Sequence, residues 1–262
     1  MRVVALLATY NEERFVGGCI EHLQRHGVET YLIDNDSTDA TVEIAERFDL
    51  AGLEAAPRDG VYAWRPLLER KSALAQTLDA DWLIHLDADE IRLPPRSGMT
   101  LAEAIAEVDA LGYNAVNFQE FTFVPTVEAP NHDHPRFQET MRRYYPYFPG
   151  RRDRLNAWKN QDVPVELAAS GGHRVSFPGL NVFPESFPMR HYLYLSVGHA
   201  VSKYVERVYD PNEVESGWHR RRAALRAEDV TLLSQAELRE TRSDDDLDAS
   251  EPWSTHPLFA RS

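Results

Sequence analysis

The chain has 262 residues, of which 43% are hydrophobic and 10% aromatic, which is enough to bury a sizeable core. Its 28 basic and 42 acidic residues give a net charge of −14, which argues against nucleic acid or an anionic membrane as the main partner. The single cysteine, Cys19, excludes an internal disulfide framework and a thiolate metal cluster, and we expect a cytoplasmic protein.

The first half of the chain alternates short apolar runs with segments of helical periodicity, which predicts an α/β fold with a mostly parallel sheet. The predicted strands are residues 3–9, 29–34, 51–56 and 81–87, and the predicted helices are residues 15–27, 39–49, 64–80 and 100–112. We expect the run VVALLA at 3–8 to be a buried strand, because it lacks the length of a membrane span and a small-residue cleavage site.

The second half of the chain differs in composition. The alternating stretch 113–125 predicts a strand, and residues 130–192 are rich in Pro, Gly, Tyr and Arg, which predicts a loop-rich region. We expect helices at 196–209 and 221–241 and a frayed acidic tail at 242–251. The predicted divisions are therefore 1–125, a loop-rich half 126–210 of the same domain, and a C-terminal helical extension 211–262.

Three predicted strands are followed by polar loops, ATYNEE at 8–13, IDNDSTD at 33–39 and LDADE at 86–90. Because the carboxyl ends of parallel strands meet at one edge of a sheet, where ligands bind, we expect these loops to converge. Asp34 ends an apolar run and is expected to face that edge. Ser37, Thr38 and Asp39 fit either this role or simple capping of the next helix.

Asp87 and Asp89 form a D-x-D pattern directly after a buried strand. Residues two apart on a strand project from the same face, so two carboxylates in these positions favour a hard divalent cation such as Mg²⁺ or Mn²⁺. A solvated strand end, or an acid that caps the next turn, is the alternative.

The segments ATYNEE, IDNDSTDAT, LERKSALAQ and LDADE, in this order over roughly residues 1–125, resemble the inverting glycosyltransferases of family 2, which have the GT-A fold. RHYLYLS, followed by a helix that contains a lysine, more loosely resembles a bacterial subgroup of these enzymes. The resemblance implies an α/β GT-A fold in which residues 1–125 bind a nucleotide-sugar and 126–210 form the acceptor side.

The resemblance also implies roles for single residues. Asp87 and Asp89 would hold Mn²⁺ or Mg²⁺ and through it the diphosphate. Lys71 would lie near the donor, unless it is a solvated helix lysine. The remaining positions that would contact the nucleotide-sugar are Thr9, Asn11, Glu12, Asp34 and Ala88.

Two roles have no clear assignment. An inverting enzyme needs a general base, usually a carboxylate. The acidic pair typical of the family late in the domain is not apparent here, and Glu120 and Asp162 are the candidates, each also interpretable as an ordinary polar residue. A histidine often supplies a third metal ligand in this fold, and His191 or His173 fits that role or a structural one.

The predicted function is the metal-dependent, inverting transfer of a hexose-like sugar from a UDP-sugar to the hydroxyl of a saccharide, lipid-linked or small-molecule acceptor. A non-catalytic nucleotide-sugar-binding protein is the alternative from a different class. A sugar nucleotidyltransferase is less favoured because ATYNEERF contains no glycine for a phosphate loop. A haloacid-dehalogenase-type phosphatase is disfavoured because Glu90 and Ile91 follow the aspartates, on a later strand.

Overall fold

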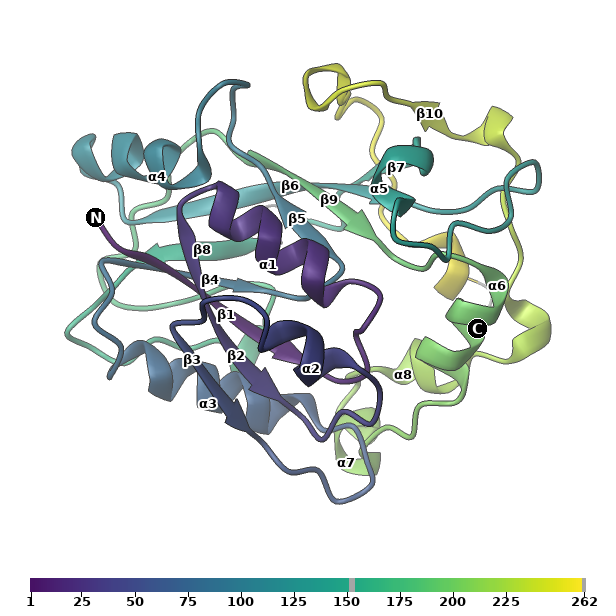
Figure 1. The fold of residues 1–262 in the computed structure, drawn as a ribbon, viewed down its shortest axis with the longest axis horizontal. Helices are drawn as coiled ribbons and strands as arrows, with labels where there is room; N and C mark the ends of the chain where they lie inside the picture. The colour runs from purple at the N-terminus through teal and green to yellow at the C-terminus, as the bar shows by residue number, and fades with distance from the viewer. Residues whose placement is uncertain (151–153, 261–262) are drawn as a thin grey trace. The chain divides into compact units, whose positions relative to one another are not determined.

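The computed structural model describes residues 1–150 and 154–260, which fold into two compact units (Figure 1). Unit 1 consists of Met1–Arg58, Trp64–Phe118 and Arg152–Met189. Unit 2 consists of Asp59–Ala63, Gln119–Arg151 and Arg190–Ser262. Each unit is therefore assembled from segments that lie far apart in the sequence.

Unit 1 is built on four parallel strands in the order β4-β1-β2-β3. Their bounds are β1 (Val3–Thr9), β2 (Val28–Asp34), β3 (Gly52–Ala55) and β4 (Trp82–Leu86). Every residue of β1 and β4 is buried, which explains why both are continuous apolar runs without alternation. The antiparallel strand β8 (Leu155–Lys159) lies beside β4, and the first residues of β6 (Ala115–Phe123) lie beside β8.

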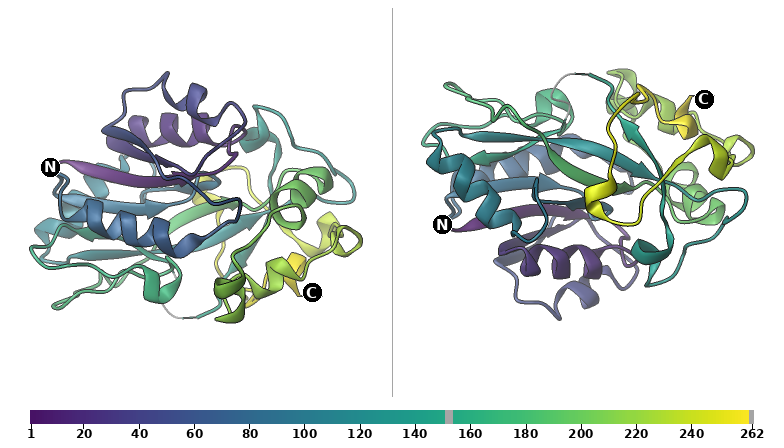
Figure 2. Two further views of the ribbon diagram at one scale, coloured as in Figure 1. Left: turned by 90° about the horizontal axis from the view of Figure 1, so that it is seen from below. Right: turned by 90° about the horizontal axis from the view of Figure 1, so that it is seen from above.

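Helices cover both faces of this mixed sheet. Helix α1 (Val16–Arg25) and helix α2 (Thr41–Ala45) lie on one face, and α3 (Trp64–Ala75) lies on the other (Figure 2). The strand order requires this arrangement: the chain moves in one direction from β1 to β3 and then returns to β4, and right-handed crossovers place the returning helix on the opposite face. The predicted α/β fold is confirmed.

Two further elements complete unit 1. Helix α4 (Leu101–Ala110) begins one residue after the predicted start, because Thr100 is its N-cap and forms a capping box with Glu103. It packs beside the end of α1, where Ala102 donates its N–H to the carbonyl of His26 over 3.1 Å. The short strand β5 (Glu90–Arg92) pairs with β9 (Phe187–Tyr192).

Unit 2 contains a smaller antiparallel arrangement in the order β10-β7-β6. The strands are β7 (Arg143–Tyr147), β10 (Arg239–Glu240) and the second part of β6. Its helices are short, namely α5 (Phe137–Thr140), α6 (Val197–Ala200) with a π-helical turn at Val201–Val205, α7 (Pro211–Glu215) and α8 (Arg220–Ala223).

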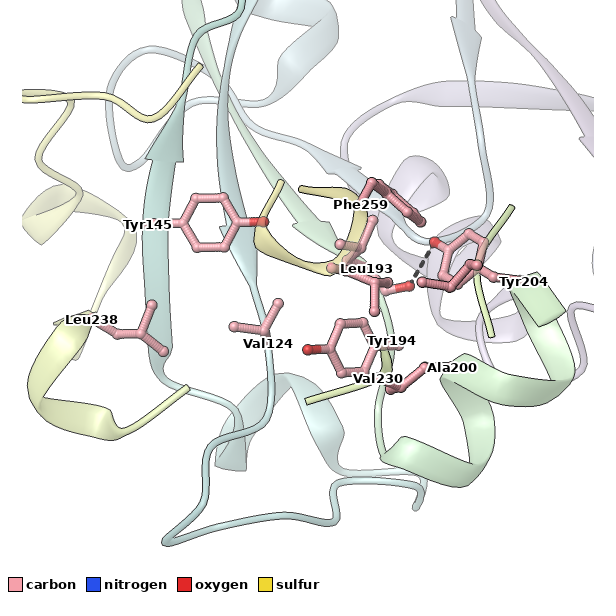
Figure 3. Close-up of a cluster of buried hydrophobic side chains, with 11 residues drawn as sticks. Val124, Tyr145, Leu193, Tyr194, Ala200, Tyr204, Val230, Leu238 and Phe259 are labelled. Atoms are coloured by element: carbon pink, nitrogen blue, oxygen red, sulfur yellow. Dashed lines mark hydrogen bonds between the residues drawn. The ribbon is translucent and has the colours of Figure 1, made fainter. Parts of the chain in front are cut away.

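The core of unit 2 is a cluster of buried aliphatic and aromatic side chains (Figure 3). Tyr204 donates its hydroxyl hydrogen to the carbonyl of Leu193 over 3.0 Å, which satisfies a polar group inside this cluster. The remaining members that Figure 3 labels are Val124, Tyr145, Tyr194, Ala200, Val230, Leu238 and Phe259.

The predicted C-terminal elements are wrong. In place of a helix at 221–241, the chain forms α8, two 3₁₀ turns at Ala227–Asp229 and Gln235–Glu237, and β10. The side chains of Asp229 and Glu237 accept hydrogen bonds from the backbone N–H groups of Arg226 and Ser234, and such local bonds compete with a continuous helix.

The acidic segment 242–251 is not a frayed tail. Arg190 pairs with Asp244, and Arg239 pairs with Asp248. Beyond this segment, Trp253 stacks on Tyr145 with ring centroids 4.5 Å apart. Within the described residues, no helix is both long and apolar enough to cross a membrane.

Candidate functional site

The carboxyl edge of the parallel strands in unit 1 brings the predicted loops together. Thr9, the last residue of β1, lies opposite Asp34, the last residue of β2. On the other side of β1, Leu86 at the end of β4 lies opposite Leu7. The strand order reverses at β1, since β2 lies on one side of it and β4 on the other, and such switch points are where α/β sheets bind ligands.

The loops after β1 and β2 are joined by hydrogen bonds. Thr9 Oγ1 donates to Asp34 Oδ1 over 3.3 Å, and the N–H of Ser37 donates to Asp34 Oδ2 over 3.0 Å. Asn11 has a left-handed backbone with φ of 55°, and its side-chain oxygen accepts from the N–H of Thr38 over 2.8 Å. These bonds hold the buried carboxylate of Asp34 in one position.

Ser37 and Thr38 do not cap the following helix. Ser37 Oγ accepts from the N–H of Asn11 over 2.9 Å, and the N-cap residue of α2, Ala40, has no side-chain cap. Glu12 is fixed in the same way, because its N–H donates to Thr41 Oγ1 over 2.7 Å. The two loops are thus one connected structure.

The D-x-D residues lie in a turn and not on a strand, because β4 ends at Leu86. The N–H of Glu90 donates to the carbonyl of Asp87 over 3.1 Å, and Glu90 Oε2 accepts from the N–H of Asp87 over 3.2 Å. The prediction that Asp87 and Asp89 share one face of a strand is therefore wrong. Ala88 and Asp89 are buried, whereas Asp87 is half-buried.

Lys71 on α3 contacts the two residues that precede this turn. Its side chain is fully buried, and Nζ contacts His85 Nδ1 at 2.8 Å and the carbonyl of Leu86 at 3.3 Å. Burial lowers the pKa of Lys71 to about 8, although the charges of Asp87 and Glu90 act in the opposite direction. The interpretation of Lys71 as a solvated helix lysine is wrong.

Glu90, the third acid of LDADE, faces Arg92. Arg92 Nη2 donates to Glu90 Oε2 over 2.7 Å and to Asn156 Oδ1 over 3.1 Å, and all three side chains are buried. The ion pair with Arg92 therefore fixes Glu90, which in turn hydrogen-bonds Asp87 in the D-x-D turn.

His173 and Asp162, two predicted site residues in unit 1, lie outside the loops described above. His173 is exposed and contacts the guanidinium of Arg154 through Nδ1. Asp162 is exposed and follows β8, whose last residue, Lys159, pairs with Trp82 at the start of β4. Asp162 thus lies at the opposite end of β4 from Asp87 and Asp89, and its predicted role as a base has no support from the fold.

The remaining two predicted residues lie in unit 2 and contact each other. His191 Nδ1 is 2.6 Å from Glu120 Oε1, and Glu120 is only 1% exposed. His256 joins them, with Nε2 at 3.8 Å from the same Glu120 oxygen. His256 was not predicted from the sequence, because it stands in a segment without periodicity and no local pattern connects it to a histidine on β9.

The comparisons with known proteins give one family. The sequence model of glycosyl transferase family 2 matches residues 5–157. The lipopolysaccharide core biosynthesis glycosyltransferase LpsC of Rhizobium meliloti (strain 1021) is 32% identical over 108 residues, which is 41% of this chain and 38% of LpsC. The chain thus spans well under two thirds of this curated relative.

Similar solved structures include S. aureus TarS 1–349 in complex with UDP, at 13% identity and a TM-score of 0.47, over 74% of this chain and 61% of that one. Another is glucosyl-3-phosphoglycerate synthase from Mycobacterium tuberculosis in complex with Mg²⁺ and UDP, at 19% identity and a TM-score of 0.33, over 45% of this chain and 43% of that one. Because the family model covers more than half of its residues, the chain belongs to glycosyl transferase family 2.

Proposed function

We propose that this protein transfers a sugar from a nucleotide-sugar to an acceptor hydroxyl, that the reaction depends on a divalent cation, and that it inverts the anomeric configuration. The observation that carries the proposal is the placement of Asp34 and the D-x-D turn at one edge of the sheet, on either side of the end of β1. A UDP-sugar is the donor to test first, on the family resemblance. A saccharide, a lipid-linked sugar or a small molecule would be the acceptor.

The donor set of the D-x-D turn fits a hard divalent cation. Asp87 and Asp89 offer carboxylate oxygens, which Mg²⁺ and Mn²⁺ prefer. Burial raises the pKa of the Cys19 thiol, and the nearby charges of Asp89, Glu90 and Asp87 raise it further. When bound, the cation would stabilise the negative charge that develops on the diphosphate leaving group.

The protein's own residues would bind and orient the donor. Asp34 is held by Thr9 and Ser37 before any ligand arrives, so a nucleoside that hydrogen-bonds its carboxylate would meet a preorganised acceptor. Asn11 and Glu12 lie in the same connected loops. Ala88 has a small side chain, which would allow the donor to approach the turn closely.

Lys71 would act on the donor through the turn. Its Nζ donates to the carbonyl of Leu86, the residue that precedes Asp87, and its burial prevents free movement. We infer that Lys71 positions the D-x-D residues and sets the local charge. The sequence predicts Glu120 or Asp162 as the base that inversion requires, and His191 or His173 as a third ligand of the cation. Of the two acids, Asp162 is disfavoured because it lies at the opposite end of β4 from the D-x-D turn.

Donor turnover tests this function. Release of nucleoside diphosphate is measured with a panel of UDP-, GDP-, ADP- and dTDP-sugars, with Mn²⁺ or Mg²⁺ and after addition of a chelator. We expect slow hydrolysis of one donor class that requires the cation and is lost in the Asp87→Asn, Asp89→Asn double variant. The exposed Asp79 provides the matched control variant Asp79→Asn, which is expected to keep turnover.

Absence of turnover with every donor and both cations would contradict the enzymatic proposal. If nucleotide binding persisted in that case, the protein would be a non-catalytic nucleotide-sugar binder. The anomeric configuration of the product, read by NMR, tests inversion separately.

A further inference from the structure

We propose that Glu120, His191 and His256 in unit 2 form a metal site for a divalent transition metal, with Zn²⁺ as the first candidate. Glu120 comes from β6, His191 from β9, and His256 from the C-terminal segment just before the 3₁₀ turn Pro257–Phe259. One ligand atom of each lies within 4.8 Å of the others, and all three side chains are at least nine-tenths buried. The proposal assigns Glu120 and His191 to this site in place of their predicted roles as base and as third ligand of the D-x-D cation, and it does not depend on sugar transfer.

The separations suit coordination after a small adjustment. Two ligands of one tetrahedral zinc ion, at bond lengths near 2.0–2.1 Å, are roughly 3.3 Å apart. His256 Nε2 is 3.8 Å from Glu120 Oε1, which is too far for a hydrogen bond, whereas His191 Nδ1 is 2.6 Å from the same oxygen. An ion between them would draw the first pair together and separate the second, with release of the proton that now joins His191 to Glu120.

Hydrogen bonds already order the Glu120 carboxylate and the His256 ring. Thr122 Oγ1 is 2.7 Å from Glu120 Oε1 and must donate its hydrogen, because a carboxylate only accepts. His256 Nδ1 is 2.8 Å from the Tyr145 hydroxyl oxygen, so Nδ1 is engaged there and Nε2 is the ring nitrogen that lies toward Glu120.

When His256 Nδ1 donates to Tyr145, Nε2 carries the lone pair that a metal ion needs, and it lies 3.8 Å from the Glu120 carboxylate. A cation stabilises a buried carboxylate beside two imidazoles. In this proposal the cation is a metal ion, whereas a proton on His256 is the outcome that would overturn it.

The outer partners have the arrangement that metal-binding histidines require. The second ring nitrogen of a ligating histidine usually donates to a neighbouring oxygen, which fixes the tautomer and the ring orientation. Tyr145 provides that oxygen, and Tyr147 stacks on the ring of His256 with centroids 3.8 Å apart. The imidazole is therefore held on its face as well as at its edge.

The ligand types select the metal. Two imidazole nitrogens and one carboxylate suit Zn²⁺ and its neighbours in the transition series, whereas Mg²⁺ and Ca²⁺ prefer oxygen alone. Three protein ligands leave a fourth position for water. Such an ion would attach the C-terminal segment to β6 and β9 within unit 2.

Metal uptake by the full chain tests the proposal. The protein is treated with a chelator, transferred to metal-free buffer and given Zn²⁺, and bound metal is measured by mass spectrometry after gel filtration. Co²⁺ replaces Zn²⁺ in a parallel sample, where the intense visible absorption of four-coordinate Co²⁺ reports geometry. We expect one zinc ion per wild-type chain, and at least about tenfold weaker binding in His256→Gln and Glu120→Gln.

Two further variants distinguish this site from zinc binding at a surface histidine and from metal binding at the D-x-D turn. His134→Gln removes an exposed histidine of the same unit and is expected to keep zinc. The Asp87→Asn, Asp89→Asn double variant is also expected to keep it. The wild-type Co²⁺ spectrum needs no variant, so misfolding of His256→Gln, checked by circular dichroism, would not remove the test.

Three results would overturn the proposal. Wild-type protein that takes up no zinc or cobalt would identify the cluster as a protonated histidine–glutamate network. Unchanged zinc affinity in both His256→Gln and Glu120→Gln would place the metal elsewhere. Loss of zinc in the aspartate double variant, with retention in His256→Gln, would assign the bound metal to the D-x-D turn.

Discussion

Buried ionisable side chains give the carboxyl edge of unit 1 its electrostatic character. Asp34, Asp89 and Lys71 are each at most 7% exposed. Asp34 and Lys71 have defined hydrogen-bond partners in place of water. A buried charge is costly unless hydrogen bonds or opposite charges compensate it. The fold therefore keeps two carboxylates and one amine buried at this edge of the sheet, where they could interact with a charged nucleotide-sugar.

Asp34 should contribute to nucleotide affinity through its charge. In Asp34→Asn the side chain keeps its shape, but it loses the carboxylate that would accept from the nucleoside. We expect about tenfold or greater weakening of UDP binding, in line with a hydrogen bond to a charged group. Calorimetric titration with and without Mn²⁺ checks this, and cation dependence should persist. Undiminished affinity would mean that Asp34 only holds its loop.

Lys71 should make the stability of the protein depend on alkaline pH. Its pKa is about 8 in the fold against 10.5 for the ordinary side chain, so the fold disfavours the charged form. The destabilisation is present below pH 8 and disappears as the pH rises toward 10.5, because only the unfolded chain still binds the proton there.

The matched comparison is Lys71→Met, which removes this titration. Relative to the variant, wild-type protein should gain on the order of 3 kcal/mol of unfolding free energy as the pH rises from about 8 to 10.5. Urea unfolding across this range measures the difference. A constant difference would show that Lys71 does not titrate in this window.

At the scale of elements, the parallel strands and their crossover helices follow directly from the sequence. Apolar runs such as VVALLAT and WLIHL lie fully inside the sheet, and turn residues separate them clearly from amphipathic helices. The 221–241 segment also shows helical spacing, yet the side-chain carboxylates of Asp229 and Glu237 accept hydrogen bonds from the backbone N–H groups of Arg226 and Ser234 and divide it. Periodicity alone does not reveal such competition.

Gly172 has a specific steric role in the loop between β8 and β9. It has φ of 86°, and an added Cβ would lie 2.8 Å from His85 Nε2 and 3.0 Å from Leu68 Cδ2. His85 is the neighbour of Lys71, so a clash here would disturb the support of the D-x-D turn.

Gly172→Ala should therefore destabilise the protein by more than Gly179→Ala. Gly179 has a similar φ of 82° but no atom within 4 Å of an added Cβ. The second variant has only the backbone cost, about 1 kcal/mol, and the first adds a clash of about 1–3 kcal/mol. Chemical denaturation of both variants measures the difference, and equal destabilisation would contradict the contact with His85.

On the scale of the whole molecule, sequence and structure agree best at the carboxyl ends of the parallel strands. Asp34, Asp87 and Asp89 could be placed because a strand end is visible in the pattern of one short segment. His256 could not, because its neighbours Tyr145 and Glu120 are brought to it by tertiary packing. The turn at Asp87–Asp89 was not predicted either, since strand periodicity does not show where pairing stops.

The C-terminal segment should be a stabilising part of unit 2. Phe259 is 6% exposed and meets Tyr204 edge-on with centroids 5.2 Å apart. Phe259→Ala should cost about 3–5 kcal/mol of unfolding free energy, whereas Phe148→Ala, at a residue that is 40% exposed, should cost under about 1 kcal/mol. Similar values for both in urea unfolding would mean that the segment is frayed in solution.

The proposed function depends above all on the carboxyl edge of unit 1, where Asp34 and a divalent cation on the D-x-D turn would bind a nucleotide-sugar. A crystal structure with UDP and Mn²⁺ is the decisive measurement. We expect the nucleoside against Asp34 and the loop of Thr9 and Asn11, with Mn²⁺ between the diphosphate and the carboxylates of Asp87 and Asp89. Nucleotide bound elsewhere, or bound at this edge with no cation on either aspartate, would contradict the proposal.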